Sequence, residues 1–227
     1  MECDHNNLLF NGELANSYDA QRNKLAPIKD ALHLCSKFFL SELAEDAQIL
    51  CVGVGTGEEL IYLAREYPGW NFTAIDPSPD MLEKCHNRLT LSGFESRCTL
   101  YEGYLHTLDN NARYDGATSI LVSHFLVDKK DRIQYFSDIH KRLRSGGLLL
   151  NADIASNVPD EYFQSLLKGW IKMHEYAQMN IDINDFGKKV SLLPINEIEN
   201  LILESGFNSA MHFYQAILIN AWLCRKA

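Results

Sequence analysis

The sequence lacks the features that define several large classes of protein. Its 227 residues contain no run of about 18 apolar residues and no basic stretch followed by a long apolar one near the start. The six cysteines are scattered, with neither a CxxC pair nor the Cys/His spacing of a zinc site. We therefore expect a cytoplasmic protein with reduced thiols, no membrane segment and no bound metal.

Positive charge is also scarce, since 21 Lys and Arg face 30 Asp and Glu, for a net charge of -9. An acidic surface works against non-specific binding to nucleic acid. Two short clusters, Lys129-Lys130-Arg132 and Lys141-Arg142-Arg144, are the local exceptions. Small or neutral partners are favoured, and the sequence does not distinguish a monomer from a homodimer.

Short apolar runs alternate with helical patterns from residue 49 onward, which is typical of a doubly wound parallel sheet. The predicted strands are Gln48–Val52, Asn71–Ile75, Cys98–Glu102, Gly116–Val122, Leu148–Asp153, Ser209–Tyr214 and Ile217–Cys224. The predicted helices are Pro27–Glu42, Glu58–Tyr67, 79–92, Asp131–Leu143, Pro159–Gln178 and Asn196–Ser205. We expect one domain, divided into an N-terminal helical lid (1–44), a ligand-binding core (45–155), a helical substrate cover (156–195) and a last helix with two strands (196–227).

Two motifs point to an adenosine site. The run Gly53-Val54-Gly55-Thr56-Gly57 separates the first predicted strand from a helix, and glycines there let a ligand approach the backbone closely. Asp76 ends the next strand, 19 residues after Gly57. A carboxylate at that place can accept hydrogen bonds from both ribose hydroxyls.

The helix after the glycine loop argues against phosphate-bearing nucleotides. The dinucleotide fingerprint GxGxxG would need glycine at Glu58, and the carboxylates of Glu58 and Glu59 would repel a pyrophosphate at the helix N-terminus. No GxxxxGK[ST] loop occurs. S-adenosylmethionine (SAM) carries no phosphate and bears a sulfonium and an ammonium, so it suits an acidic helix start. A nucleotide-dependent oxidoreductase is the less favoured alternative.

These motifs resemble those of the Rossmann-fold (class I) SAM-dependent methyltransferases, in the small stand-alone form of the family. The resemblance also includes 120–126, 143–147 and the entry segment 16–22 followed by Pro27. It implies a mostly parallel seven-stranded Rossmann-like sheet with an antiparallel last strand, SAM as cofactor and S-adenosylhomocysteine as product. The cofactor-binding residues that it implies are Gly53, Gly55, Thr56, Gly57, Asp76, Pro77, Met81, Glu102, Gly103, Tyr104, Ser123, Tyr18 and Arg22.

Two positions depart from the family pattern. Cys51 stands where an acid usually supports the methionine end of SAM, and Glu58 or Glu59 can substitute for it. Tyr104 stands where an acid often binds the adenine amino group, so a neighbouring residue or backbone carbonyl must form that bond.

The methyl acceptor is expected between Ser123-His124-Phe125 and the insertion Pro159–Gln178. The reaction is an in-line displacement at the sulfonium methyl, and His124 is either a structural histidine or a base that deprotonates or positions the acceptor. We expect a small-molecule acceptor. A tRNA-modifying methyltransferase and a non-catalytic SAM-binding regulatory protein are the alternatives, and Tyr18 and Arg22 are expected to form a lid that orders over the cofactor.

Overall fold

The structure, a computed structural model, describes residues 20–227 except 22, 110 and 157–159. Seven strands form one sheet in the order β3-β2-β1-β4-β5-β7-β6, in which only β7 runs antiparallel to its neighbours. The strands are β1 (Gln48–Val52), β2 (Asn71–Asp76), β3 (Cys98–Glu102), β4 (Tyr114–Ile120), β5 (Leu143–Ile154), β6 (Ser209–Ala216) and β7 (Ile219–Arg225). The predicted mostly parallel, Rossmann-like sheet is confirmed.

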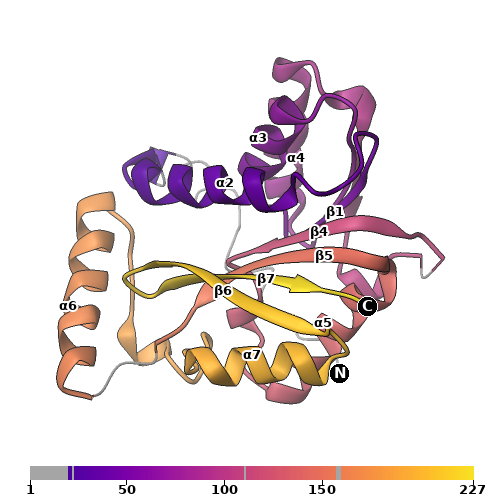
Figure 1. Cartoon of the computed structure of the whole chain (residues 1–227). Helices are drawn as coiled ribbons and strands as arrows, with labels where there is room; N and C mark the ends of the chain where they lie inside the picture. Colours follow the sequence, from indigo (N-terminus) through magenta and orange to yellow (C-terminus); the bar gives the residue numbers. More distant parts are fainter. Residues whose placement is uncertain (1–19, 22, 110, 157–159) are drawn as a thin grey trace.

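Helices cover both faces of the sheet (Figure 1). They are α2 (Ala26–Leu40), α3 (Glu58–Glu66), α4 (Pro79–Ser92), α5 (Lys129–Arg142), α6 (Asp160–Ala177) and α7 (Ile195–Glu204), with short 3-10 turns η1 (Glu95–Arg97), η2 (Leu105–Thr107), η3 (Ser123–Phe125) and η4 (Ile183–Asp185). In Figure 1, α2, α3 and α4 lie on one face, α5 and α7 lie on the other, and α6 stands across the end where β5 finishes. The carboxyl ends of the parallel strands lie at that end.

Two hydrophobic layers hold the helices to the sheet, because successive residues of a strand point to opposite faces. On β1, Ile49 and Cys51 pack with Trp70 and the helices α3 and α4. Leu50 packs on the opposite side, together with residues of α5 and α7. The sheet is therefore buried on both faces, as a doubly wound fold requires.

Local sequence signals determine where α4 begins and ends. The Ser78 hydroxyl accepts a hydrogen bond from the backbone N–H of Met81, Pro79 occupies the first turn, and Gly93 ends the helix at a φ of 73°. These are the signals from which 79–92 was predicted, and the observed helix has the same bounds.

Predicted boundaries near β4 and β5 are wrong. β4 ends at Ile120 rather than Val122, because Leu121 takes a left-handed φ of 58° before η3 begins. The predicted helix Asp131–Leu143 includes a residue that belongs to β5, since Leu143 already pairs with Tyr114 of β4. The turn at Gly146 and Gly147 therefore lies within β5, where a register irregularity accommodates it.

The segment after β5 covers one end of the sheet through α6. Trp170 is buried against Ile154 and Leu218, whereas Tyr162 and Tyr176 are exposed.

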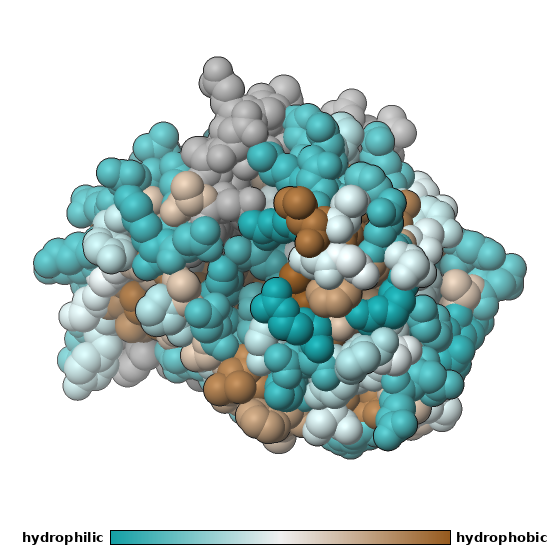
Figure 2. Space-filling model, turned by 90° about the horizontal axis from the view of Figure 1, so that it is seen from above, coloured by the Kyte–Doolittle hydropathy of each residue, from teal (hydrophilic) through white to brown (hydrophobic). Residues whose placement is uncertain are grey.

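No helix in the described ranges is long and apolar enough to cross a membrane. Seen from the side of α2, the visible surface is mostly hydrophilic with small separate hydrophobic spots (Figure 2).

Candidate functional site

The glycine loop and Asp76 meet at the carboxyl edge of the sheet, between β1 and β2. Gly53 has a φ of 66°, and a Cβ there would lie 2.5 Å from Val122 Cγ2. Asp76 Oδ2 accepts a hydrogen bond from the Gly55 N–H at 2.8 Å, and its Oδ1 accepts one from the Ser78 N–H at 2.9 Å. Burial raises the pKa of Asp76, and these two donors offset part of the rise. Backbone donors thus fix the carboxylate from two sides.

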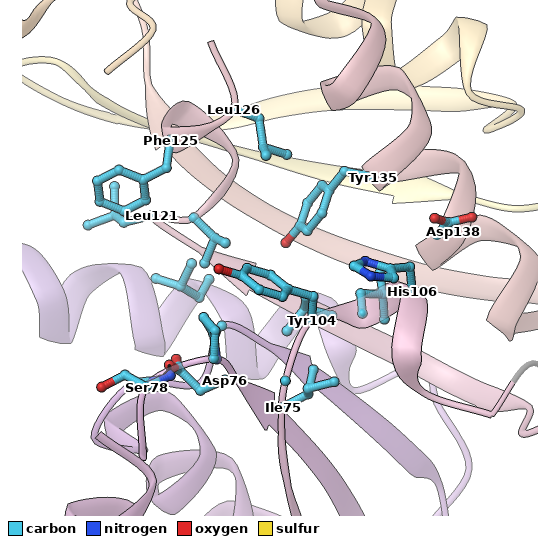
Figure 3. Close-up of a pocket in the computed structure, with 18 of the residues that line it drawn as sticks. Ile75, Asp76, Ser78, Tyr104, His106, Leu121, Phe125, Leu126, Tyr135 and Asp138 are labelled. Atoms are coloured by element: carbon cyan, nitrogen blue, oxygen red, sulfur yellow. Dashed lines mark hydrogen bonds between the residues drawn. The ribbon is translucent and has the colours of Figure 1, made fainter. Parts of the chain in front are cut away.

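A cavity of about 360 Å³ opens beside Asp76 (Figure 3). Seven of the predicted cofactor residues line it: Gly53, Gly55, Asp76, Pro77, Met81, Gly103 and Tyr104. The Tyr104 ring lies across the middle of the view with its hydroxyl toward Leu121, and the Tyr135 hydroxyl points into the same space from α5. The structure therefore brings the glycine loop, the acid of β2 and the turn after β3 around one cavity.

The far wall of the cavity comes from α5, whose side chains are not among the predicted site residues. Asp131, Gln134, Tyr135 and Asp138 line it. Their spacing of three, four and seven residues places them on one face of a helix, and this spacing was the available signal. Tyr135 is anchored to β4 through a 2.8 Å hydrogen bond between its hydroxyl and that of Ser119.

Three predicted cofactor residues lie off the cavity wall on the β1–β3 side. The carbonyl and hydroxyl oxygens of Thr56 accept hydrogen bonds from Arg88. Gly57 packs so closely on α4 that an added Cβ would lie 2.6 Å from Cys85 Sγ. Glu102 is exposed at the end of β3. Tyr18 and Arg22, expected in the lid, lie outside the described residues.

Ser123 and His124 also lie off the wall, in a buried network around Asp153. Asp153 is fully buried at the end of β5, where its Oδ1 lies 2.7 Å from His124 Nδ1. Its Oδ2 accepts hydrogen bonds from Ser123 and, at 2.5 Å, from Arg132. Burial alone would raise the pKa of Asp153, but His124, Arg132 and Ser123 together hold it below its ordinary value.

The network around Asp153 lies next to the cavity wall. The His124 ring lies 4.3 Å from the ring of Phe125, centroid to centroid, and Phe125 lines the cavity. The His124 carbonyl accepts a 2.7 Å hydrogen bond from the Ser191 N–H, in the segment that follows α6. The end of β5 thus holds the His124 imidazole and the cover holds its backbone carbonyl, one residue from the cavity.

The two candidates to replace the missing acid at Cys51 behave differently. The Glu58 carboxylate pairs with Lys29 at 2.9 Å. Glu59 is half-buried as a residue, but its carboxyl group is enclosed, which raises its pKa to about 8, with smaller contributions from Glu58 and Asp76. The Glu59 charge also adds to the effect of burial in raising the pKa of Cys51. Glu59 therefore occupies the neighbourhood of Cys51 and Asp76, whereas Glu58 turns toward α2.

The two basic clusters of the sequence are partly buried and partly paired with acids. Arg132 and Arg142, one from each cluster, are almost completely buried. Ion pairs join Lys129 to Glu197, Lys141 to Asp138 and Arg144 to Asp115. These clusters therefore supply much less exposed positive charge than their sequence suggests.

Comparison with known proteins shows what the chain is similar to. Residues 49–147 match the sequence profile of the family described as methyltransferase domain. A malonyl-[acyl-carrier protein] O-methyltransferase of Priestia megaterium is 28% identical over 145 residues, which cover 60% of this chain and 46% of that protein. This chain thus spans less than half the length of that relative.

Solved structures share the fold at low sequence identity. A mitomycin 7-O-methyltransferase superposes with a TM-score of 0.66 and 17% identity, over 88% of this chain and 54% of that one. An O-methyltransferase family protein of Burkholderia thailandensis gives a TM-score of 0.63 and 15% identity, over 91% of this chain and 60% of that one. The resemblance to the Rossmann-fold (class I) methyltransferases is confirmed for the fold, and residues 49–147 are similar to a methyltransferase domain.

Proposed function

We propose that this chain is a SAM-dependent methyltransferase that methylates an oxygen atom of a small-molecule acceptor. The observation that carries the proposal is the Asp76 carboxylate, held by the N–H groups of Gly55 and Ser78 where it lines the cavity. Each of these bonds uses one carboxylate oxygen, and the remaining lone pairs are available to ribose hydroxyls.

The cavity fits the adenosine part of SAM. Its volume of about 360 Å³ lies within the range of small-molecule sites, roughly 300–1,000 Å³. Ile75, Met81 and Leu105 offer an apolar surface to a flat base. None of the described residues on the wall is Lys or Arg, whereas Asp76, Asp131 and Asp138 are acidic. Such a wall disfavours a phosphate and suits a cofactor that carries positive charge.

Glu59 is our candidate to bind the methionine ammonium of SAM. Its carboxyl group lies near Asp76 and Cys51, where the family more often has an acid. An enclosed carboxyl with a raised pKa lacks a compensating cation, and an ammonium ion would supply one. Glu58 is a poorer candidate because Lys29 already pairs with it.

When bound, SAM supplies a methyl group that its positively charged sulfur already activates, so the protein's main tasks are alignment and exclusion of water. The hydrogen bond between His124 Nδ1 and Asp153 favours the tautomer in which Nδ1 carries the proton. Nε2 is then the nitrogen that can take a proton from an acceptor hydroxyl. We propose His124 as this base, acting on an acceptor that enters beside Phe125.

Three observations support a small acceptor with a reactive oxygen. The relatives named above include O-methyltransferases, whose names give mitomycin or a malonyl group on a carrier protein as acceptor. An oxygen acceptor must lose a proton, which gives a histidine base a purpose. The basic clusters that would anchor RNA are partly buried and paired.

Calorimetry followed by an acceptor screen tests this function. Purified protein should bind SAM and S-adenosylhomocysteine more tightly than NAD or ATP, and it should release S-adenosylhomocysteine with at least one member of a panel of phenols, hydroxy acids and malonyl thioesters. Replacing His124 by Ala should lower kcat by about 100- to 10,000-fold with little change in SAM affinity. Tighter binding of NAD or ATP would reject the cofactor, and full turnover by a folded H124A variant would reject the base.

A further inference from the structure

Arg132 is a charged side chain with no exposure to solvent, on the first turns of α5. Removing a guanidinium from water is costly unless other groups satisfy its charge and its donors. Replacing a buried ion pair by apolar residues of similar size is often neutral or stabilising, so packing alone does not explain a buried arginine. Its burial therefore calls for a specific partner.

The guanidinium joins three segments that are distant in sequence. One terminal nitrogen donates to Asp153 Oδ2 at 2.5 Å and to the Ser123 hydroxyl at 3.1 Å. The other donates to the Ser191 hydroxyl at 3.2 Å. Arg132 thus contacts the acid that orients His124, the residue before His124, and the cover segment whose N–H binds the His124 carbonyl.

We propose that Arg132 is a positioning residue that balances the charge of Asp153, holds this carboxylate where it accepts from His124 Nδ1–H, and links the cover at Ser191 to the backbone of His124. The link to catalysis rests on the proposed function, in which His124 Nε2 takes the acceptor proton. The arrangement of Arg132, Asp153 and His124 does not.

The charge of Arg132 matters as well as its donors. A buried carboxylate beside an imidazole favours the imidazolium form, and an adjacent guanidinium offsets that effect. The groups that face this cluster are Asp153 from β5, Arg132 and Tyr135 from α5, and the neutral Ser191 from the cover. Arg132 is thus the guanidinium that faces the Asp153 carboxylate in this cluster.

Nuclear magnetic resonance of the His124 imidazole tests the proposal without cofactor or acceptor. In the wild-type protein the ring nitrogens, assigned with H124Q, should show the Nδ1–H tautomer. In Arg132→Met the titration midpoint should move up by about one pH unit. Arg142→Met is the matched control, because Arg142 is also buried on α5 but donates to the carbonyls of Asp138 and Leu108 instead of a carboxylate. It should keep the wild-type midpoint.

A second variant keeps the test decisive if R132M does not fold. Arg132→Lys keeps the charge but loses the fork, so the midpoint should stay near wild type while amide exchange at Ser191 becomes at least about tenfold faster. An unchanged midpoint in folded R132M, an equal shift in R142M, or unchanged Ser191 exchange in R132K would overturn the proposal. Because these readouts need no turnover, absence of methyl transfer would reject the proposed function and leave this result standing. Where turnover is found, the acidic limb of kcat/KM in R132M should move in the same direction as the midpoint.

Discussion

The site has two parts, which are built from different kinds of interaction. One is the cavity beside Asp76, where we propose the cofactor, and the other is the buried network around Asp153, which holds the proposed base. On the cofactor side, neutral backbone N–H groups of Gly55 and Ser78 hold one carboxylate that still lines a cavity. On the base side, a fully buried acid is held by a buried guanidinium and an imidazole. Neutral donors can fix a group that must stay available to a ligand, whereas buried charges depend on one another. Damage to the first side should therefore cost binding, and damage to the second should cost folding as well.

The largest expected effect is on the base side. Asp153→Ala leaves Arg132 buried without its counter-ion, so we expect the free energy of unfolding to fall by about 3–5 kcal/mol. Urea unfolding at pH 7 measures it. Glu42→Ala is the control, because it breaks the exposed pair with Arg225 and should cost less than about 1 kcal/mol. Similar losses in the two variants would contradict the distinction between the two sides.

The next effect is on the cofactor side and concerns affinity. Asp76→Ala should weaken S-adenosylhomocysteine binding by about 1.5–3 kcal/mol, because charge-assisted hydrogen bonds to the ribose are lost. Asp80→Ala removes a carboxylate from the first turn of α4, off the cavity wall, and should leave affinity unchanged. Calorimetry on folded proteins decides the matter, and equal affinity of D76A and wild type would place the ribose elsewhere.

The sequence could predict those elements of the fold that local residues specify. The bounds of β1, α4 and β3 agree with prediction because capping residues, glycines and short apolar runs specify them locally. The start of β5 was placed five residues late, at Leu148 rather than Leu143. Ser145, Gly146 and Gly147 have the composition of a loop, and only pairing of Leu143 with Tyr114 across the sheet makes them part of a strand. Long-range pairing has no local signal.

The site divides in the same way. The glycine loop and Asp76 were predictable because each follows a strand whose end the sequence marks. Arg132 was read as part of a basic cluster, since nothing beside it in sequence shows that α5 turns it toward β5. One signal was available: Asp153 lies near the end of a mostly apolar strand, and a buried acid there requires a cation from another element. The sequence could thus raise the question of a partner, but only the tertiary contacts identify it.

A smaller effect separates the two acids at the start of α3. The pKa of Glu59 is about 8 in the folded protein against an ordinary 4.5, so its protonated form is favoured by folding. Its stabilising contribution is complete below about pH 4.5 and is lost as the pH rises toward 8. Glu59→Gln imitates the protonated form, so the variant should gain about 1–2 kcal/mol over wild type between pH 5 and pH 8, without cofactor.

Thermal or urea unfolding across this pH range measures the gain. Glu58→Gln is the matched control, because Glu58 pairs with Lys29 and its replacement should bring no stability that grows with pH. Saturating SAM should reduce the advantage of E59Q if an ammonium ion binds at Glu59. A difference in unfolding free energy between E59Q and wild type that does not change with pH would contradict the description of Glu59 as an enclosed acid.

The last prediction is that RNA binding is weak and does not depend on the basic clusters, and it tests the chemical class of the methyl acceptor. If RNA were the acceptor, each phosphate contact would add about 0.7 to the slope of log affinity against log salt for a single strand. Two of the three lysines in the clusters, Lys129 and Lys141, are paired with Glu197 and Asp138, and the arginines 132 and 142 are buried. We therefore expect tRNA binding weaker than about 100 µM at 0.15 M salt, and no change in Lys129→Ala or Lys141→Ala. Fluorescence titration at two salt concentrations measures this. Tight binding with a steep salt dependence that these variants reduce would indicate RNA as the acceptor. That result would contradict the small-molecule proposal but would leave the cofactor proposal unchanged.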